Sequence, residues 1–331
     1  MSAAPVGIAE LAAAVARGER RALARAVTLA ESTRDVDREH AGQLLACVAG
    51  RAGGALRLGV SGAPGVGKST FIESFGSRLA DRGRKLAVLA VDPSSAAAAG
   101  AILGDKTRMA DLTRRAEVFI RPSPAGAVLG GVARHTREAV LLCEAAGYDT
   151  VIVETVGVGQ SEVAAAAVTD LLLLLLSPVA GDELQGIKRG VMELADVVAV
   201  NKADGETRTA ATRTAAECRA ALNLVRPRSR AWRAEVLTCS ARSGEGLAAV
   251  EDAVARCHKA LAESGELEQR RAAQREEWLW SEAAQTLLDA LRRDKKAAAL
   301  APKLLRAVAA GDMTVTAAAG KLAGVKKCSA N

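Results

Sequence analysis

The chain has 331 residues, a formal net charge of +7 and 50% hydrophobic residues, of which few are aromatic. This length suffices for one large α/β domain with helical additions, whose core must be built from Leu, Val, Ile and Ala. Lys and Arg are interleaved with Asp and Glu, and no basic block alternates with aromatic residues, which argues against a nucleic-acid-binding protein.

The first 52 residues have a helical pattern. Apolar residues recur at helical spacing from Leu11 to Leu29, a second apolar segment covers residues 44–48, and Gly53 and Gly54 then break the pattern. Acidic residues interrupt the basic character of this region, which favours a helical extension of the mature protein over an organellar transit peptide. We expect a cytoplasmic protein, and a location in the mitochondrial matrix only if this extension is a transit peptide.

Strand and helix patterns alternate between residues 53 and 264. The predicted strands cover residues 56–60, 86–91, 118–120, 150–153, 171–176, 197–200 and 235–238. Such alternation requires crossover connections, so we expect a mostly parallel sheet flanked by helices on both faces. The run of six leucines at 171–176 is too short to span a membrane and fits a buried strand.

No strand pattern follows Gly265. Residues 266–293 predict a long charged helix that carries Trp278 and Trp280, and residues 297–323 predict two shorter helices separated near Gly311. An apolar stripe on these helices must pack on its own domain or on a second subunit, and we expect a homodimer. The six cysteines form no CxxC pair, so we expect reduced, mostly buried thiols.

A phosphate-binding motif follows the first predicted strand. Residues 62–69 read GAPGVGKS, which fits GxxxxGK[ST] between an apolar strand and a helix expected to begin near Thr70. In such a loop backbone N–H groups face the β-phosphate, Lys68 reaches the β- and γ-phosphate oxygens, and the Ser69 hydroxyl ligates Mg²⁺. The predicted nucleotide-binding residues are Gly62, Ala63, Pro64, Gly65, Val66, Gly67, Lys68, Ser69 and Thr70.

Two later segments favour guanine as the base. Asn201, Lys202 and Asp204 form an NKxD motif directly after the strand 197–200, at the sheet edge where ligands bind in such folds. The Asp204 carboxylate can accept hydrogen bonds from N1–H and the exocyclic amine of guanine, whereas adenine offers no such pair of donors. The loop after the next strand can contact the base edge through Ser240, Ala241 and Arg242. The sequence therefore predicts GTP and GDP as ligands.

Carboxylates also follow two other strands. Asp92 follows the strand 86–91, and Glu154 follows the strand 150–153, with Gly157 three residues later. Carboxylates at strand ends beside a P-loop are placed to hold Mg²⁺ and its waters. We expect Ser69, Asp92 and Glu154 to be metal ligands and Lys68 and Glu154 to act in catalysis.

Five segments identify a family. They read VDPSS (91–95), ILGDKTRM (102–109), FIRPSP (119–124), ETVGVGQSE (154–162) and GDELQGIKRG (181–190). Together they resemble the MeaB/ArgK family of SIMIBI-class P-loop GTPases, in register from about Ala22 to Lys321. Members of this family are chaperones of adenosylcobalamin-dependent methylmalonyl-CoA mutase. The resemblance implies a GTPase that gates cofactor loading and protects the mutase, without binding cobalamin itself.

The resemblance also implies roles for individual residues. Asp105 would join the predicted Mg²⁺ ligands, residues 154–160 would sense the γ-phosphate, and residues 182–188 would form the switch that the mutase engages. That switch would place Gln185 or Lys188 toward the phosphates, although a lone lysine such as Lys188 is otherwise a typical solvated charge. The implied organisation is an N-terminal helical extension (1–52), a P-loop GTPase domain (53–264) and a C-terminal helical dimerisation arm (265–331).

The chain departs from the family pattern in two loops. Residues 96–100 are four alanines and a glycine where the family usually has Thr, Arg and paired glycines, and residues 125–129 read AGAVL in place of SSGTL. The first departure removes an arginine and a glycine from a loop expected near the nucleotide, so we expect it to affect loop mobility and activity but not the fold.

Alternative functions remain open. A metallocentre-assembly GTPase would need a His- or Cys-rich store, whereas His40, His135 and His258 are dispersed along the chain. An ArgK-type kinase would need an acceptor pocket, for which the sequence has no signature. A binding module without hydrolysis is also compatible with the motifs, because intrinsic GTPase rates can be very slow.

Overall fold

A computed structural model of the protein describes residues 7–32, 34–91, 109–122, 129–155, 161–178 and 189–324. The chain divides into two compact units, Met1–Arg271 and Ala272–Asn331. The predicted boundaries at residues 52 and 264 stay predictions.

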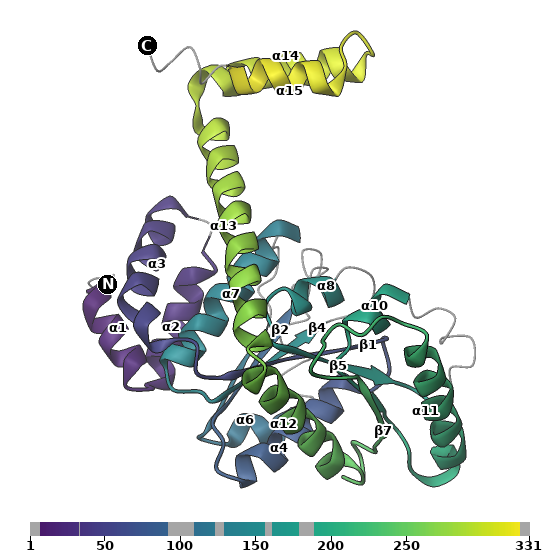
Figure 1. The fold of residues 1–331 in the computed structure, drawn as a ribbon. Coiled ribbons are helices and arrows are strands. Elements are labelled where there is room, and N and C mark those ends of the chain that lie inside the picture. Colours follow the sequence, from purple (N-terminus) through teal and green to yellow (C-terminus); the bar gives the residue numbers. More distant parts are fainter. Residues whose placement is uncertain are drawn as a thin grey trace. The chain divides into compact units, whose positions relative to one another are not determined.

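The larger unit is built on a seven-stranded sheet in which every pairing is parallel (Figure 1). The strand order is β3-β2-β4-β1-β5-β6-β7, so the P-loop strand β1 is central. The strands are β1 (Leu56–Gly62), β2 (Leu86–Val91), β3 (Val118–Arg121), β4 (Thr150–Thr155), β5 (Leu171–Leu176), β6 (Val197–Val200) and β7 (Glu235–Thr238). All seven predicted strands are confirmed, and β1 and β4 each continue two residues beyond their predicted ends.

Different helices cover the two faces of this sheet. Leu171, Leu173 and Leu175 of β5 belong to one core cluster, and Leu174 and Leu176 belong to the other. Successive side chains of a strand point to opposite faces, so this division follows directly from the all-leucine strand. The helices are α4 (Lys68–Asp81), α6 (Ala110–Arg114), α7 (Leu129–Ala145), α8 (Ser161–Ala166), α10 (Arg189–Leu194), α11 (Arg208–Asn223) and α12 (Leu247–Glu263).

Three helices precede the sheet. They are α1 (Ile8–Ala16), α2 (Arg20–Ala30) and α3 (Asp35–Val48), followed by a short 3₁₀ turn, η1 (Ala49–Arg51). The prediction of one helical stretch with a second segment at 44–48 is wrong in detail. Gly18, at φ +76°, follows the end of α1, and α3 begins nine residues earlier than predicted, at Asp35. All three helices contact α7 within the larger unit, and the carbonyl of Ala30 lies 2.9 Å from His135 Nδ1.

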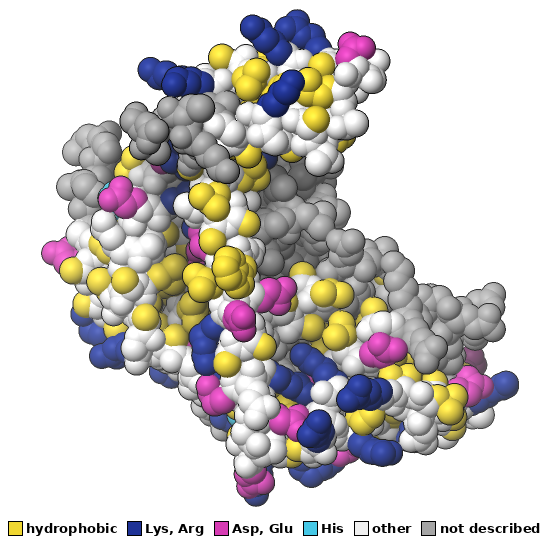
Figure 2. Space-filling model, turned by 45° about the horizontal axis from the view of Figure 1, so that its top comes forward, with side chains coloured by type: hydrophobic (Ala, Val, Ile, Leu, Met, Phe, Trp, Pro, Cys, Tyr) yellow, Lys and Arg dark blue, Asp and Glu magenta, His cyan; other side chains and the backbone are white. Residues whose placement is uncertain are grey.

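The C-terminal helices agree with the prediction. α13 (Glu266–Arg293) begins in the larger unit, and α14 (Lys295–Ala309) and α15 (Val315–Gly324) follow in the smaller one. Asp294 caps α14 by accepting hydrogen bonds from the backbone N–H groups of Lys296 and Ala297. Large apolar side chains of this unit are exposed, notably Leu305, and Figure 2 shows hydrophobic side chains beside Lys and Arg on its surface.

Cysteines among the described residues are free thiols, four of them buried and Cys47 exposed. Burial raises the pKa of Cys218 to about 11 and that of Cys239 to about 12, so both thiols are neutral near neutral pH. This agrees with the expected reduced and mostly buried thiols, while Cys328 lies outside the described residues. In the part of the chain that the structure describes, no helix is both long and apolar enough to cross a membrane.

Candidate nucleotide-binding site

The P-loop connects the end of β1 to the start of α4. Its first glycine, Gly62, has φ +155°, and a Cβ atom there would lie 2.4 Å from the carbonyl oxygen of Leu175 on β5. Gly67 has φ +94° and precedes the first residue of α4, which is Lys68 rather than a residue near Thr70 as predicted. The glycines are therefore required by close packing and backbone conformation, and the first turn of α4 directs its N–H groups to the loop.

Lys68 lies against the loop. Lys68 is only 9% exposed, and its Nζ donates hydrogen bonds to the carbonyl oxygens of Gly62 at 2.7 Å and Ala63 at 3.1 Å. Both acceptors are neutral, whereas a phosphate oxygen is charged and makes a stronger hydrogen bond with an ammonium group. The position of Lys68 thus fits the predicted contact with the phosphates.

Ser69 and Glu154 form the described part of the expected metal site. Ser69 Oγ donates to Glu154 Oε1 at 3.1 Å, and Glu154 is only 3% exposed. The two meet because β4 pairs with β1, with Glu154 opposite Val60. A hydroxyl and a carboxylate are oxygen ligands of the kind that Mg²⁺ prefers, so the donor set fits this ion. The other two predicted ligands, Asp92 and Asp105, lie outside the described residues.

Asn201 joins the two halves of the site. Its Nδ2 donates to the carbonyl of Val66 in the P-loop at 2.9 Å, and its Oδ1 accepts from the N–H of Ala241 at 2.9 Å. The side chain is 2% exposed, so these hydrogen bonds are shielded from water. The sequence placed Asn201 among the nucleotide-binding residues. It did not reveal that Asn201 connects the P-loop to the loop of residues 240–242 after β7, here called the base loop.

The other two NKxD residues lie beside this connection. Lys202 has φ +58°, unusual for a residue other than glycine, and its Nζ donates to the carbonyl of Gly65 at 2.8 Å. Asp204 is half-buried, and its carboxylate makes no hydrogen bond or ion pair with any described residue. Its position is compatible with the predicted contact to a base, which stays a prediction.

The base loop follows β7. Ser240 is fully buried and its Oγ accepts from the N–H of Ser243 at 3.1 Å, while Arg242 is exposed. Ser74 of α4 donates to the carbonyl of Ala241 at 2.6 Å, so the P-loop helix also holds this loop. Ser74 was not among the predicted site residues, because its spacing on α4 does not show which loop it meets.

A pair of buried hydroxyl groups beside the P-loop was also not among the predicted site residues. Thr155 Oγ1 donates to Ser61 Oγ at 3.0 Å, and both side chains are fully buried. These residues follow Glu154 and precede Gly62, so the pair ties the end of β4 to the entrance of the P-loop. Gly157, Gln185 and Lys188 lie outside the described residues, and their predicted roles are not addressed by this geometry.

Comparison with known proteins identifies the family. Residues 23–296 match the family of the methylmalonyl-CoA mutase-associated GTPase MeaB. A probable GTPase of Mycobacterium tuberculosis is 50% identical over 312 residues, which cover 94% of this chain and 93% of that protein. The mitochondrial methylmalonic aciduria type A homolog of Mus musculus is 45% identical over 316 residues, covering 92% of this chain and 76% of the relative.

A solved structure supports the same assignment. The crystal structure of an LAO/AO transport system kinase matches with a TM-score of 0.76 and 37% identity, covering 99% of this chain and 100% of that one. The parallel sheet, the P-loop geometry and the NKxD connection are thus found in a chain whose similarity to its relatives extends over nearly its full length. The chain belongs to the MeaB family of GTPases.

Proposed function

We propose that this GTPase is a chaperone that gates the loading of adenosylcobalamin into methylmalonyl-CoA mutase and protects that enzyme. The proposal is supported by the family description, which names a GTPase associated with methylmalonyl-CoA mutase, and by the name of the mouse relative, which refers to methylmalonic aciduria. The structural observation that carries the nucleotide part is the Asn201 side chain, which bonds to both the P-loop and the base loop. In this proposal, these two hydrogen bonds join the loops into one continuous site for a guanine nucleotide.

In this proposal each part of the site has one task. Residues 62–70 bind the phosphates, with Lys68 on the β- and γ-phosphate oxygens, and Asp204 with the loop 240–242 binds guanine. Ser69 and Glu154, together with Asp92 and Asp105, hold Mg²⁺, which supplies positive charge to offset the charge of the phosphates. Gly157 contributes to γ-phosphate sensing, and no cobalamin binds to this chain itself.

Selection of guanine gives the first prediction. GTP and GDP should bind at least about a hundredfold more tightly than ATP, which corresponds to about 2.7 kcal/mol. Asp204→Asn should replace an acceptor by a donor and shift the preference toward xanthine nucleotides. Calorimetric titration with GDP, ADP and XDP measures this, with Glu206→Gln, an exposed neighbouring acid, as the matched control. Equal affinity of the unmodified chain for GDP and ADP would refute the assignment of the base site.

Stimulation by the mutase tests the chaperone role. We expect a B12-dependent methylmalonyl-CoA mutase to raise the GTPase rate, because the P-loop and NKxD motifs contain no arginine finger and docking can supply a further cation. Lys188→Ala should leave basal turnover and GTP affinity nearly unchanged while removing most of the stimulated rate, with Gln185 as the next candidate. The exposed Lys85 provides the control variant Lys85→Ala.

The ratio of stimulated to basal phosphate release is the decisive quantity. A variant that keeps full stimulation excludes Lys188, and an unmodified chain without stimulation removes the chaperone role. Release of phosphate from GTP in the absence of any acceptor also separates this proposal from an ArgK-type kinase, which transfers the phosphoryl group to a substrate. A metallocentre-assembly GTPase would instead respond to the enzyme that receives the metal.

The proposal includes a homodimer formed through the C-terminal helices. Leu287, Leu305 and Val315 are 64%, 69% and 70% exposed, which is unusual for large apolar side chains on one small unit. Pairing of two such surfaces would remove them from water. Light scattering should give a dimer for the full chain and a monomer for a chain ended after Gly265.

A further inference from the structure

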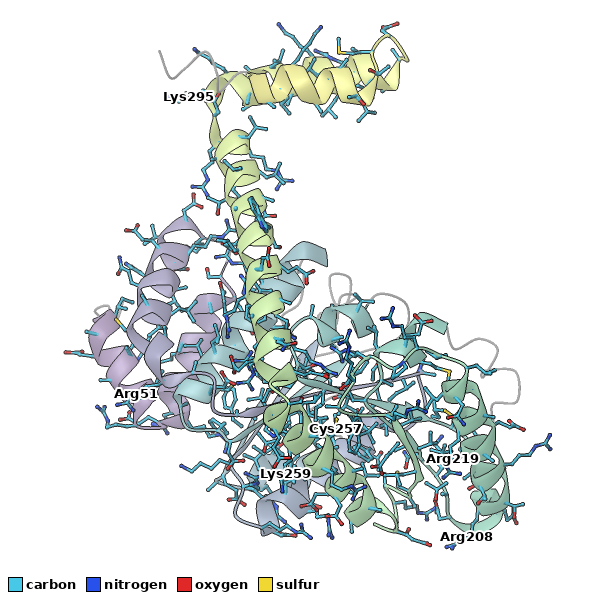
Figure 3. The ribbon with its side chains drawn as sticks, viewed as in Figure 1. Arg51, Arg208, Arg219, Cys257, Lys259 and Lys295 are labelled. Carbon is cyan, nitrogen blue, oxygen red and sulfur yellow. The ribbon has the colours of Figure 1, made fainter. Side chains whose placement is uncertain are left out.

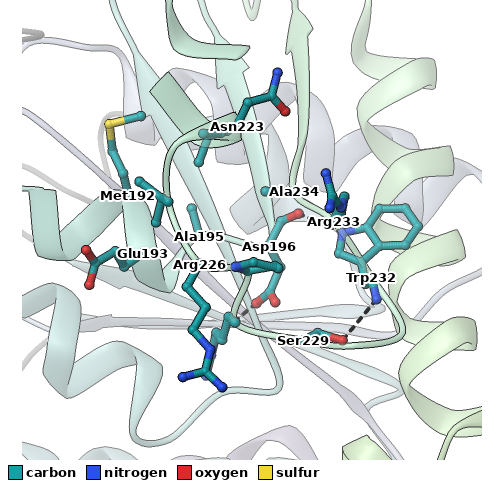
Figure 4. Close-up of a pocket in the computed structure, with 14 residues that line it drawn as sticks. Met192, Glu193, Ala195, Asp196, Asn223, Arg226, Ser229, Trp232, Arg233 and Ala234 are labelled. Carbon is teal, nitrogen blue, oxygen red and sulfur yellow. Dashed lines mark hydrogen bonds and ion pairs between the residues drawn. The ribbon is translucent and has the colours of Figure 1, made fainter. Parts of the chain in front are cut away.

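A separate cavity lies at the amino ends of the strands, whereas the P-loop lies at their carboxyl ends. It has a volume of about 200 Å³ and is formed by the end of α10, the end of α11 and the loop that leads into β7 (Figure 4). Its lining residues directly precede β6 and β7, at Asp196 and Ala234. Because all strands are parallel, this cavity lies at their amino ends and the nucleotide site at their carboxyl ends. The proposed function does not use it.

One wall of this cavity is apolar. Met192, Leu222, Val225, Pro227 and Trp232 contribute to its lining. The indole Nε1 of Trp232 donates to the carbonyl of Asp196 at 2.9 Å, and its backbone N–H donates to Ser229 Oγ at 3.0 Å. These bonds fix the ring beside the cavity (Figure 4). At about 30 Å³ for each water-sized group, the space suits a molecule of about six non-hydrogen atoms.

The remaining wall is cationic. The loop before β7 carries Arg226, Arg228, Arg230 and Arg233, and all but Arg230 line the cavity. Arg226 and Arg233 are exposed and make no hydrogen bond or ion pair with any described residue. Arg228 has a side chain that is only 20% exposed, and its Nη1 donates to the carbonyl of Leu194 at 3.1 Å and to Asp196 Oδ2 at 2.9 Å. The other two guanidinium nitrogens of Arg228, Nε and Nη2, make no hydrogen bond with any described residue.

The acidic groups around the cavity do not balance these arginines. Asp196 is 1% exposed, and its carboxylate is shared by Arg228 and by Arg270, whose Nη1 donates to Oδ1 at 3.0 Å. Asp196 Oδ2 also accepts from the N–H of Leu172. A buried nitrogen of Arg270, Nη2, has no hydrogen-bond partner among the residues that the structure describes. Burial and the nearby Arg270 lower the pKa of Arg228, although Asp196 opposes this shift. One buried carboxylate thus serves two guanidinium groups.

Two further acids lie near the cavity. Glu266 Oε1 accepts from the backbone N–H groups of Arg230 and Ala231, so it holds the loop in place. Glu193 is exposed at the cavity lining. The lining itself therefore contains three arginines against Glu193 and Asp196, and the second of these is already shared with Arg270. An added anion would be favoured at this place.

We propose that this cavity, the arginine-loop pocket, binds a small organic anion that carries a carboxylate or phosphate group on a short apolar body. Guanidinium groups match both anions in geometry, and the apolar body packs against Trp232 and its neighbours. The inference rests on described residues away from the nucleotide site and holds whether or not the chaperone role is correct. For a ligand of this size we expect a Kd of about 1 mM.

Tryptophan fluorescence provides a local reporter. The chain has three tryptophans, so the variant Trp278→Phe/Trp280→Phe leaves Trp232 as the only one. Butyrate, inorganic phosphate and butanol are titrated at constant ionic strength with saturating GDP, which keeps the P-loop filled. We expect a saturable change with butyrate, and a response at least tenfold weaker with butanol because it lacks the charge. Tighter binding of butyrate than of phosphate would assign part of the affinity to the apolar wall.

Variants of single arginines locate the site. In the same background, Arg228→Met should weaken butyrate binding at least tenfold, and Arg226→Gln/Arg233→Gln should weaken it several-fold without affecting the fold, because both side chains are exposed and unpaired. Arg230→Gln is the matched control, since Arg230 lies on the same loop but does not line the cavity. The double variant decides the matter if Arg228→Met fails to fold.

Three results would overturn the proposal. They are no saturable change with either anion up to about ten times the expected Kd, a response to butanol equal to that of butyrate, and a loss in Arg230→Gln equal to that in Arg226→Gln/Arg233→Gln. The last result would show that anion binding depends on the overall positive charge of the loop and not on the arginines that line the cavity.

Discussion

Replacing Lys68 by Ala should lower kcat/KM for GTP by at least about a hundredfold, the size of loss typical when a donor to developing charge is removed. The ammonium group lies within hydrogen-bond distance of two P-loop carbonyls and is almost fully buried. The other lysine at the P-loop, Lys202, does not replace this ammonium group, because it is exposed and its Nζ donates to the carbonyl of Gly65. The loss of Lys68 therefore removes positive charge at the phosphates without a substitute.

The measurement compares nucleotide binding with folding. Titration with GTP and GDP and single-turnover hydrolysis give affinity and rate, and circular dichroism melting reports the fold. Lys259→Ala is the control, because Lys259 lies on α12 with a side chain that is 75% exposed (Figure 3). Among the described residues it pairs only with Glu263 on the same helix. Wild-type GTP affinity in a folded Lys68→Ala chain would show that the phosphate site lies elsewhere.

The strands were predictable because each is a short apolar run with a clear boundary. The six leucines of β5 are buried on both faces of the sheet, as a parallel sheet between two helical layers requires. The order of the strands was not predictable. It depends on which side of β1 each crossover returns, and no residue spacing records that choice.

The unpredictable strand order also explains why the hydrogen bonds that connect the site's motifs were not predicted. The P-loop and NKxD residues were predicted one by one because each motif is local in sequence. The hydrogen bonds of Asn201 to Val66 and Ala241 join residues 135 and 40 positions apart. They exist because β6 is beside β7 and is separated from β1 only by β5. Only the strand order brings these groups together.

Buried charges were the other feature that the sequence did not reveal. Arg57 lies between two leucines of β1 and is 4% exposed, with its guanidinium paired to Glu144 of α7 at 2.8 Å. A charged residue in a strand is normally assigned to an exposed position. Here it faces a carboxylate from a distant helix, and the pairing depends on tertiary packing that a local pattern cannot show.

A second buried pair gives the other large effect. Asp170 precedes β5, is fully buried, and accepts hydrogen bonds from the N–H of Arg57 at 3.0 Å and from Nε and Nη2 of Arg271 at 2.8 Å and 2.7 Å. Arg271 also donates to the carbonyls of Gly53 and Ala55. Hydrogen bonding to Asp170 raises the pKa of Arg271, so the guanidinium stays charged. One carboxylate thus connects the starts of β1, β5 and α13.

Asp170→Asn should lower the free energy of unfolding by about 3–5 kcal/mol. The amide has nearly the shape of the carboxylate, but it removes the negative charge and turns one acceptor into a donor that faces the donors of Arg271. A buried guanidinium without its counter-charge is costly, and the loss is a large share of the about 5–15 kcal/mol that stabilises a typical domain.

Glu217→Gln is the matched control for this prediction. Its carboxylate pairs with Arg213 on the surface of α11, where the two side chains are 46% and 83% exposed, so the same change from acid to amide should alter stability by no more than about 0.5 kcal/mol. Urea unfolding of the three chains, followed by circular dichroism, compares their midpoints and slopes. An Asp170→Asn chain that unfolds at the same urea concentration as the Glu217→Gln chain would show that Arg271 finds sufficient compensation in the carbonyls of Gly53 and Ala55. The carboxylate would then select the conformation in which β1, β5 and α13 begin rather than stabilise it.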